Sequence, residues 1–74
     1  MPNLSNRELE VLTNVAAGLS GKQVASKLGI SIKTVRNHLS QVFSKLGAGN
    51  RVEAVTNALR DGLLHLWPLT VSRS

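Results

Sequence analysis

The chain has 74 residues and no cysteine, so we expect one small domain whose core is built from aliphatic side chains, without disulfides or thiolate metal ligands. No apolar run reaches the roughly 18–20 residues of a membrane span and no signal peptide is visible, which predicts a cytoplasmic protein that does not contact a membrane. The formal net charge of +5 favours an anionic partner, and two aromatic residues are too few for a surface of stacked rings.

The first predicted helix covers residues 6–17. Ser5 stands three residues before Glu8, which is the spacing of a capping box, and Leu4 and Leu9 have the spacing of a hydrophobic staple. Gly18 follows this segment, and glycine just after a helix adopts the left-handed conformation at little cost. The side chains predicted to form its core face are Leu9, Leu12, Val15, Ala16 and Leu19.

The next two predicted helices cover residues 21–28 and 32–46. Ser20 and Gln23 form a second capping box before the shorter helix, and Ser31 has the position of the cap of the longer one. Between them lies a three-residue turn that contains Gly29, which is the spacing of a helix-turn-helix. The core face of the shorter helix is predicted to comprise Val24, Ala25 and Leu28.

A fourth helix is predicted over residues 51–61, with Asn50 and Glu53 at its start and Val55, Ala58 and Leu59 on its core face. Leu63 and Leu64 are expected to cover the core. No segment shows the alternating pattern of a strand. The predicted fold class is therefore all-α, a four-helix bundle-like domain at residues 1–64 that contains a helix-turn-helix, with a partly disordered tail at residues 65–74.

The basic residues are concentrated in the middle of the sequence. No acidic residue occurs between Glu10 and Glu53, whereas this stretch holds six basic residues, namely Lys22, Lys27, Lys33, Arg36, Lys45 and Arg51. A positive field of one sign attracts nucleic acid. Charge alone, however, fits a solvated lysine-rich surface equally well. The distribution of side chains around the helices has to distinguish this interpretation from nucleic-acid binding.

The helix predicted at 32–46 has two chemically different faces. On a helical wheel, its core stripe comprises Val35, Leu39, Val42, Phe43 and Leu46. The opposite side and its shoulders carry Lys33, Arg36, Asn37, Ser40, Gln41 and Ser44, and one flank carries Thr34, His38 and Lys45. An ordinary exposed helix face mixes both charge signs, whereas this face has no carboxylate. Its donors suit the major groove, where Arg or Lys reads guanine and Asn reads adenine.

No constellation in the sequence indicates an enzyme or a metal site. His38 could be a metal ligand or a base, but its only counterpart, His65, is not accompanied by cysteine or clustered carboxylates. No phosphate loop, triad or carboxylate pair can be assembled. We therefore predict no catalytic residue, no metal and no cofactor. The remaining rival is a basic helical module that binds an acidic protein.

Taken together, the motifs resemble the LuxR-type (also called GerE-type) DNA-binding domain of bacterial transcriptional regulators. The resemblance covers residues 4 to about 64. It rests on Leu4-Ser5-x-Arg7-Glu8-x-Glu10-Val11-Leu12, Gly18-Leu19-Ser20-x-Lys22-x-Val24-Ala25-x-x-Leu28-Gly29-Ile30-Ser31, Lys33-Thr34-Val35-x-Asn37-His38, Lys45-Leu46-Gly47 and Arg51-x-Glu53-Ala54-Val55. A sigma-factor-like promoter-binding domain shares a similar start, but the fourth capped segment favours the LuxR type.

The resemblance implies a role for individual residues in binding double-stranded DNA. The base-contacting positions fall on Lys33, Arg36, Asn37 and Ser40. The phosphate-contacting positions fall on Ser20, Lys22, Thr34, His38, Lys45 and Arg51. The fourth helix commonly makes the dimer contact in this family, which here implicates Val52, Thr56 and Arg60. RNA polymerase is a further candidate partner, and an effector domain of a response regulator or quorum-sensing regulator is expected to precede such a module.

Two positions depart from the family pattern. Gly21 stands where the family often has Asn or another polar residue, and it should weaken the start of its helix by about 0.5–1 kcal/mol relative to Ala. Ile32 stands where the family often has a charged or polar residue. From the sequence, Ile32 either contacts a thymine methyl group or simply stays exposed.

Overall fold

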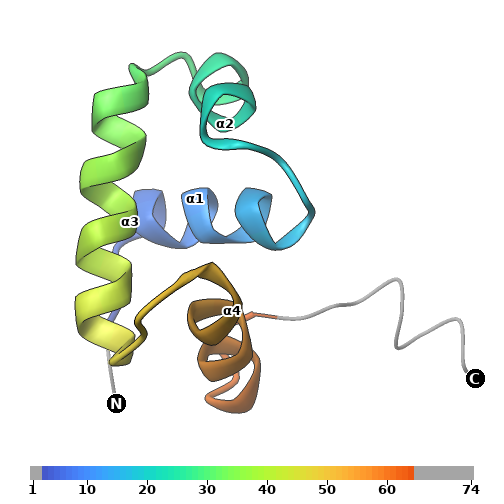
Figure 1. The fold of residues 1–74 in the computed structure, drawn as a ribbon, viewed down its shortest axis with the longest axis vertical. Coiled ribbons are helices and arrows are strands. Elements are labelled where there is room, and N and C mark those ends of the chain that lie inside the picture. Colours follow the sequence, from blue (N-terminus) through green and yellow to red (C-terminus); the bar gives the residue numbers. More distant parts are fainter. Residues whose placement is uncertain (1–2, 65–74) are drawn as a thin grey trace, which may run out of the picture.

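Residues 3–64 are described by the computed structural model, and the regular secondary structure of this part of the chain is all α-helix (Figure 1). The helices are α1 (Asn6–Ala16), α2 (Gly21–Leu28), α3 (Ile32–Leu46) and α4 (Arg51–Arg60). The predicted fold class and all four helices are confirmed, although α1 and α4 each end one residue earlier than predicted. The prediction of a partly disordered tail lies outside the described residues. None of the helices within residues 3–64 has the length and hydropathy to span a membrane.

Each helix begins at the predicted cap. The Oγ atoms of Ser5 and Ser20 accept the N–H groups of Glu8 and Gln23, and both of these side chains return the bond to the cap residue. The side chains of Ser31 and Asn50 accept the N–H groups of Thr34 and Glu53 at the starts of α3 and α4, without the return bond of a full capping box. At α4, the pairing of Asn50 with Glu53 predicts that Glu53 accepts the N–H of the cap residue Asn50. In the structure, Oε1 of Glu53 instead accepts the N–H of Gly49 at 2.8 Å.

The turn between α2 and α3 depends on Gly29. This residue has φ 70° and ψ 34°, in the left-handed region that a side chain would make strained. The N–H groups of Gly29 and Ile30 both reach the carbonyl of Ala25, which satisfies the last turn of α2. The chain can therefore reverse within three residues and start α3 at the angle of a helix-turn-helix.

The core consists of two clusters on either side of α1. One cluster joins α1, α2 and the first half of α3, and it comprises Val11, Val15, Val24, Ala25, Val35 and Leu39. The other joins α1, the second half of α3, α4 and the following segment, and it comprises Leu12, Val42, Leu46, Ala54, Ala58 and Leu64. The expected cover by Leu63 and Leu64 is confirmed, since Leu64 is buried and Leu63 packs against the second cluster.

The buried stripe of α1 is wider than predicted. Val11 was not among its predicted core residues, yet its side chain is fully buried, as is Ala54 of α4. Six residues predicted for the core faces of α1, α2 and α4 are only half-buried at the edges of the two clusters, namely Leu9, Ala16, Leu19, Leu28, Val55 and Leu59. The reason is that α1 packs against α2, α3 and α4 at once, so it buries more than one face.

The arrangement leaves one side of α3 uncovered. In Figure 1, α2, α1 and α4 follow one another along the length of α3, all on the same side of it. Each of these three helices contacts α3. The side of α3 that faces away from them is therefore not covered by another helix of residues 3–64.

Candidate nucleic-acid interface

The uncovered side of α3 carries the polar side chains that the helical wheel predicts there. Val35, Leu39, Val42 and Leu46 are buried, and Phe43 is half-buried between the two clusters. The side chains that we call the outer face of α3 are all exposed, namely Lys33, Arg36, Asn37, Ser40, Gln41 and Ser44. The predicted register of α3 is therefore confirmed, and its four predicted base-contacting residues lie together on the outer face.

Most of the positive charge on α2, α3 and the start of α4 has no ion-pair partner within residues 3–64. Within residues 3–64 the ion pairs are Arg7–Glu10, Lys45–Glu8 and Arg60–Asp61. The fourth carboxylate in that range, Glu53, accepts a backbone N–H. The basic residues of the described chain that lack a carboxylate within ion-pair distance are Lys22, Lys27, Lys33, Arg36 and Arg51. All five lie on α2, on α3 or at the first residue of α4, so the net field is concentrated around the helix-turn-helix.

Three of the predicted phosphate contacts meet at the start of α2. Lys22 lies in the first turn, where the free N–H groups and the helix dipole favour an anion. The Oγ of Ser20 accepts a backbone bond, which leaves its hydroxyl proton available to a phosphate oxygen. A methyl group added at Gly21 would lie 3.6 Å from Nη2 of Arg51, which is an ordinary van der Waals distance. The guanidinium of Arg51 therefore lies beside the start of α2.

Thr34 and His38 lie on one flank of α3 and are both half-buried. The hydroxyl of Thr34 is 2.9 Å from the hydroxyl of Ser31, the cap of the same helix. This contact fixes the first turn of α3. A hydroxyl pair can still offer a proton to a phosphate, since each oxygen can donate one bond and accept others.

Lys45 has a partner that the sequence did not reveal. Its Nζ donates to Oε1 of Glu8 at 2.7 Å and to the backbone carbonyl of Asn3 at 3.2 Å. The Glu8 side chain is 8% exposed and that of Lys45 is 35% exposed. The ion pair therefore ties the last turn of α3 to the first turn of α1, and it neutralises a charge predicted to face phosphate.

The same contacts lower the pKa of Glu8. The hydrogen bond from Lys45 is the largest cause, followed by the bond from the backbone N–H of Ser5, which is 2.9 Å from the carboxylate. Burial acts in the opposite direction, because it penalises the charged form. The sequence pattern places Glu8 only in the capping box of α1. The spacing to Ser5 revealed that bond, but no local signal links residues that are 37 positions apart.

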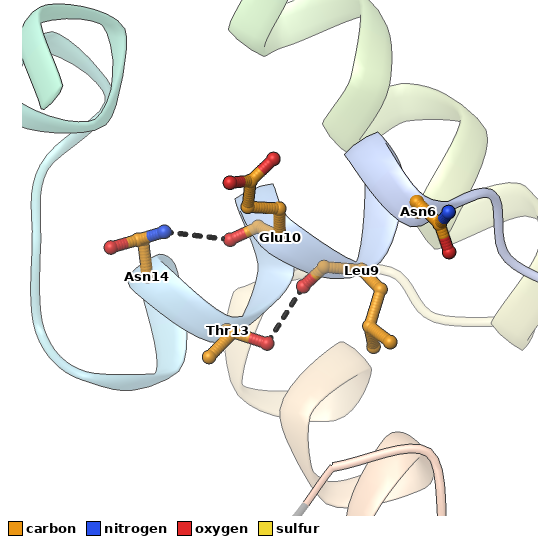
Figure 2. Close-up of a pocket in the computed structure, with 5 residues that line it drawn as sticks. All are labelled: Asn6, Leu9, Glu10, Thr13 and Asn14. Carbon is orange, nitrogen blue, oxygen red and sulfur yellow. Dashed lines mark hydrogen bonds between the residues drawn. The ribbon is translucent and has the colours of Figure 1, made fainter. Parts of the chain in front are cut away.

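A shallow hollow on α1 offers no comparable chemistry (Figure 2). It is lined by Asn6, Leu9, Glu10, Thr13 and Asn14. The Oγ1 of Thr13 donates to the carbonyl of Leu9 at 2.7 Å, and the Asn14 amide donates to that of Glu10 at 2.8 Å. Within residues 3–64 no buried side-chain polar atom lacks a partner, and no three metal-ligating side chains come together.

The predicted dimer residues lie on the exposed side of α4. Val52 is 75% exposed, which is unusual for a large apolar side chain, and Thr56 is exposed one turn later. Both line a second shallow hollow, between the end of α1 and the start of α4. Arg60 lies at the end of α4, and its Nε is 3.3 Å from the carboxylate of Asp61.

The fold and this distribution of charge agree with what comparison with known proteins shows. Residues 2–58 match the family described as "Bacterial regulatory proteins, luxR family". The chain belongs to this family. It is a LuxR-type helix-turn-helix DNA-binding domain, in which α2 and α3 form the helix-turn-helix.

Relatives of this luxR-family domain include two bacterial regulators. The chain is 44% identical over 61 residues to "Transcriptional regulatory protein YdfI" of Bacillus subtilis (strain 168), which is 82% of this chain and 29% of YdfI. It is also 44% identical over 61 residues to "Oxygen regulatory protein NreC" of Staphylococcus aureus (strain JH9), again 82% of this chain but 28% of the relative. The chain thus spans less than a third of these relatives.

Solved structures show the same fold. The response regulator ChrA of a heme-sensing two-component system superposes with a TM-score of 0.82 at 47% identity, over 86% of this chain and 32% of ChrA. The transcription factor GerE superposes with a TM-score of 0.81 at 41% identity, over 85% of this chain and 94% of GerE.

Proposed function

We propose that this luxR-family domain recognises a specific duplex sequence by placing α3 in the major groove. The observation that carries this proposal is the outer face of α3, which is exposed and free of carboxylates. It is accompanied by basic residues on α2, α3 and the start of α4 that have no ion-pair partner within residues 3–64. A groove about 12 Å wide admits one helix, and its base edges present acceptors to Arg and Lys and a donor–acceptor pair to Asn.

In this arrangement the two sets of residues have different tasks. Lys33, Arg36, Asn37 and Ser40 would contact base edges. The backbone contacts would come from Ser20, Lys22, Thr34, His38 and Arg51, with a smaller share from Lys45 because of its pair with Glu8. Phosphate contacts fix the orientation of the domain on the duplex, whereas base contacts carry sequence information.

The domain would act as a homodimer on an inverted repeat. Exposed Val52, together with Thr56 and Arg60, would form the contact between two copies of α4. Two recognition helices would then enter successive major grooves, roughly 34 Å apart. This arrangement predicts that two half-sites bind with a fixed separation.

The relatives support a wider role. YdfI is named a transcriptional regulatory protein and ChrA a response regulator of a two-component system, and the chain matches about 30% of each. The chain would accordingly supply the DNA-binding output of a transcriptional regulator in the bacterial cytoplasm, where the chromosome lies. RNA polymerase is the expected protein partner at the promoter, and no catalytic step is assigned to the domain.

Selection of binding sites from a random duplex pool tests the proposal. We expect an enriched inverted repeat whose half-sites are about one helical turn apart, and binding that weakens steeply with salt. If no sequence is enriched and random duplex binds as tightly as any selected pool, the proposal that α3 recognises base sequence is contradicted. Absence of salt-dependent duplex binding would instead favour an acidic protein as the partner of the basic face.

A further inference from the structure

Ile32 is an apolar side chain exposed at the start of the helix that would enter the groove. Its exposed fraction is 39%, and Val52 is the other large apolar residue within residues 3–64 that is classed as exposed. The neighbouring Ile30 packs against the first core cluster, whereas Ile32 belongs to neither cluster of the described chain. Packing within residues 3–64 therefore leaves part of the Ile32 side chain exposed.

The position of Ile32 on α3 places it beside the proposed base-reading side chains. It is the first residue of α3, and the residues one, four and five positions later lie around the same end of the helix. Those residues are Lys33, Arg36 and Asn37, and all of them are exposed. The N-terminal residues of a recognition helix are the ones that reach base edges. Ile32 would therefore enter the same groove.

The start of α3 is held rigidly enough to aim this side chain. The Oγ of Ser31 accepts the N–H of Thr34 at 3.0 Å, and the two hydroxyls are 2.9 Å apart. Isoleucine is β-branched, so few χ1 rotamers are open to it. A side chain that is already ordered loses little conformational entropy when it makes a contact.

The groove offers one apolar group for such a side chain. Among the major-groove edges of the four base pairs, thymine presents a C5 methyl group, while the other groups are hydrogen-bond donors and acceptors. We propose that Ile32 reads a thymine by packing against its C5 methyl group, next to the base pairs contacted by Lys33 and Arg36. The inference rests on the proposed placement of α3 in the major groove.

Deoxyuridine tests this contact, because it differs from thymidine only by that methyl group. Each thymine of a selected half-site is replaced in turn, and binding is measured with the wild-type chain and with Ile32→Ala. At one position, the replacement should weaken wild-type binding about fourfold, which corresponds to about 0.8 kcal/mol for one buried methyl group. Ile32→Ala should bind the thymine site more weakly than wild type and lose no further affinity at that position.

Two matched controls separate the contact from a general effect on α3. Ile32→Val keeps a branched aliphatic side chain and should retain the response to deoxyuridine. On a site with cytosine at that position, 5-methylcytosine should increase the affinity of wild type but not of Ile32→Ala. Thermal unfolding of each variant should stay at the wild-type temperature, since the side chain lies outside the core clusters.

The outcomes distinguish this proposal from the one on which it rests. If wild type and Ile32→Ala lose the same affinity at every thymine, or if the half-site holds no thymine beside the bases read by Lys33 and Arg36, the contact is overturned. If a specific site emerges and Asn37→Ala relaxes the preference at one of its base positions, recognition by α3 stands without Ile32. If no specific site emerges, both proposals fail.

Discussion

Asn37 has the side chain on the outer face of α3 whose chemistry is most selective. Its side-chain amide can donate to N7 of an adenine and accept from the N6 amino group of the same adenine. No other base presents this pair of groups in the major groove. Asn37→Ala should therefore cost about 1–3 kcal/mol on the selected site and relax the preference at one base position. Competition binding against single-base variants of the site measures both effects.

Asn6→Ala is the matched control for Asn37, because Asn6 is an exposed asparagine that belongs to α1 and not to the outer face of α3. It should leave affinity and preference unchanged. If Asn37→Ala lost as much affinity on random duplex as on the selected site, the residue would belong to the backbone contacts.

Lys22 and Lys45 should respond differently to salt, although both were predicted to contact phosphate. Lys22 has no ion-pair partner within residues 3–64, so Lys22→Ala should reduce the slope of log affinity against log salt by about 0.9. Lys45 is already paired with Glu8 at 2.7 Å, so Lys45→Ala should change the slope by less than half as much. Salt titrations on random duplex measure these slopes.

Lys27→Ala serves as the control for the two lysine variants. Lys27 is exposed on α2 but lies outside the predicted contact set, and its removal should barely change the slope. A Lys45→Ala slope equal to that of Lys22→Ala would mean that Lys45 leaves Glu8 when DNA binds.

The pairing of α1 with α3 through Glu8 and Lys45 makes stability depend on pH. Because the pKa of Glu8 is lowered in the folded chain, its ion pair stabilises the fold above the ordinary glutamate pKa of about 4.3. This contribution is lost as the pH falls through the lowered folded-state value. Glu8→Gln should lower the free energy of unfolding by about 1.5 kcal/mol near pH 7. The difference from wild type should shrink below about pH 4.

Denaturant titrations of wild type and Glu8→Gln between pH 3 and 7 provide the measurement. Glu10→Gln removes an exposed ion pair with Arg7 and should cost less than about 0.5 kcal/mol. A constant difference between wild type and Glu8→Gln across this range would show that the carboxylate charge does not stabilise the contact.

The contrast between Ser5 and Lys45 shows why some elements could be predicted and others not. The start of each helix is encoded within four residues, so Ser5, Ser20, Ser31 and Asn50 could be identified from spacing alone. The outer face of α3 follows from the helical period in the same local way. The bond from Lys45 to Glu8 and the burial of Val11 depend on how α1 meets three other helices, and no local pattern encodes that.

Across the whole molecule, the exposed surface of α4 determines whether two copies can bind together. Val52→Ser should leave affinity for a single half-site unchanged, since Val52 lies on α4 and away from the outer face of α3. On the complete inverted repeat it should reduce the cooperative free energy by about 1–2 kcal/mol, because an apolar contact is lost at the proposed interface. Binding isotherms on half-site and full-site duplexes give the two values.

Thr13→Ser provides a matched change, because Thr13 is an exposed residue of α1 outside the proposed contact. It should affect neither binding isotherm. Unchanged cooperativity in Val52→Ser would place the contact between protomers elsewhere on the domain.

The corner between α3 and α4 is closed by one more bond. The side-chain amide of Asn57 donates to the backbone carbonyl of Leu46 at 2.9 Å, so a residue of α4 satisfies the end of α3. The helix proposed to contact a second copy and the helix proposed to contact bases are therefore joined by this bond as well as by the second core cluster. An operator with one extra base pair between its half-sites would therefore have to be accommodated either at this corner or at the contact between the two copies.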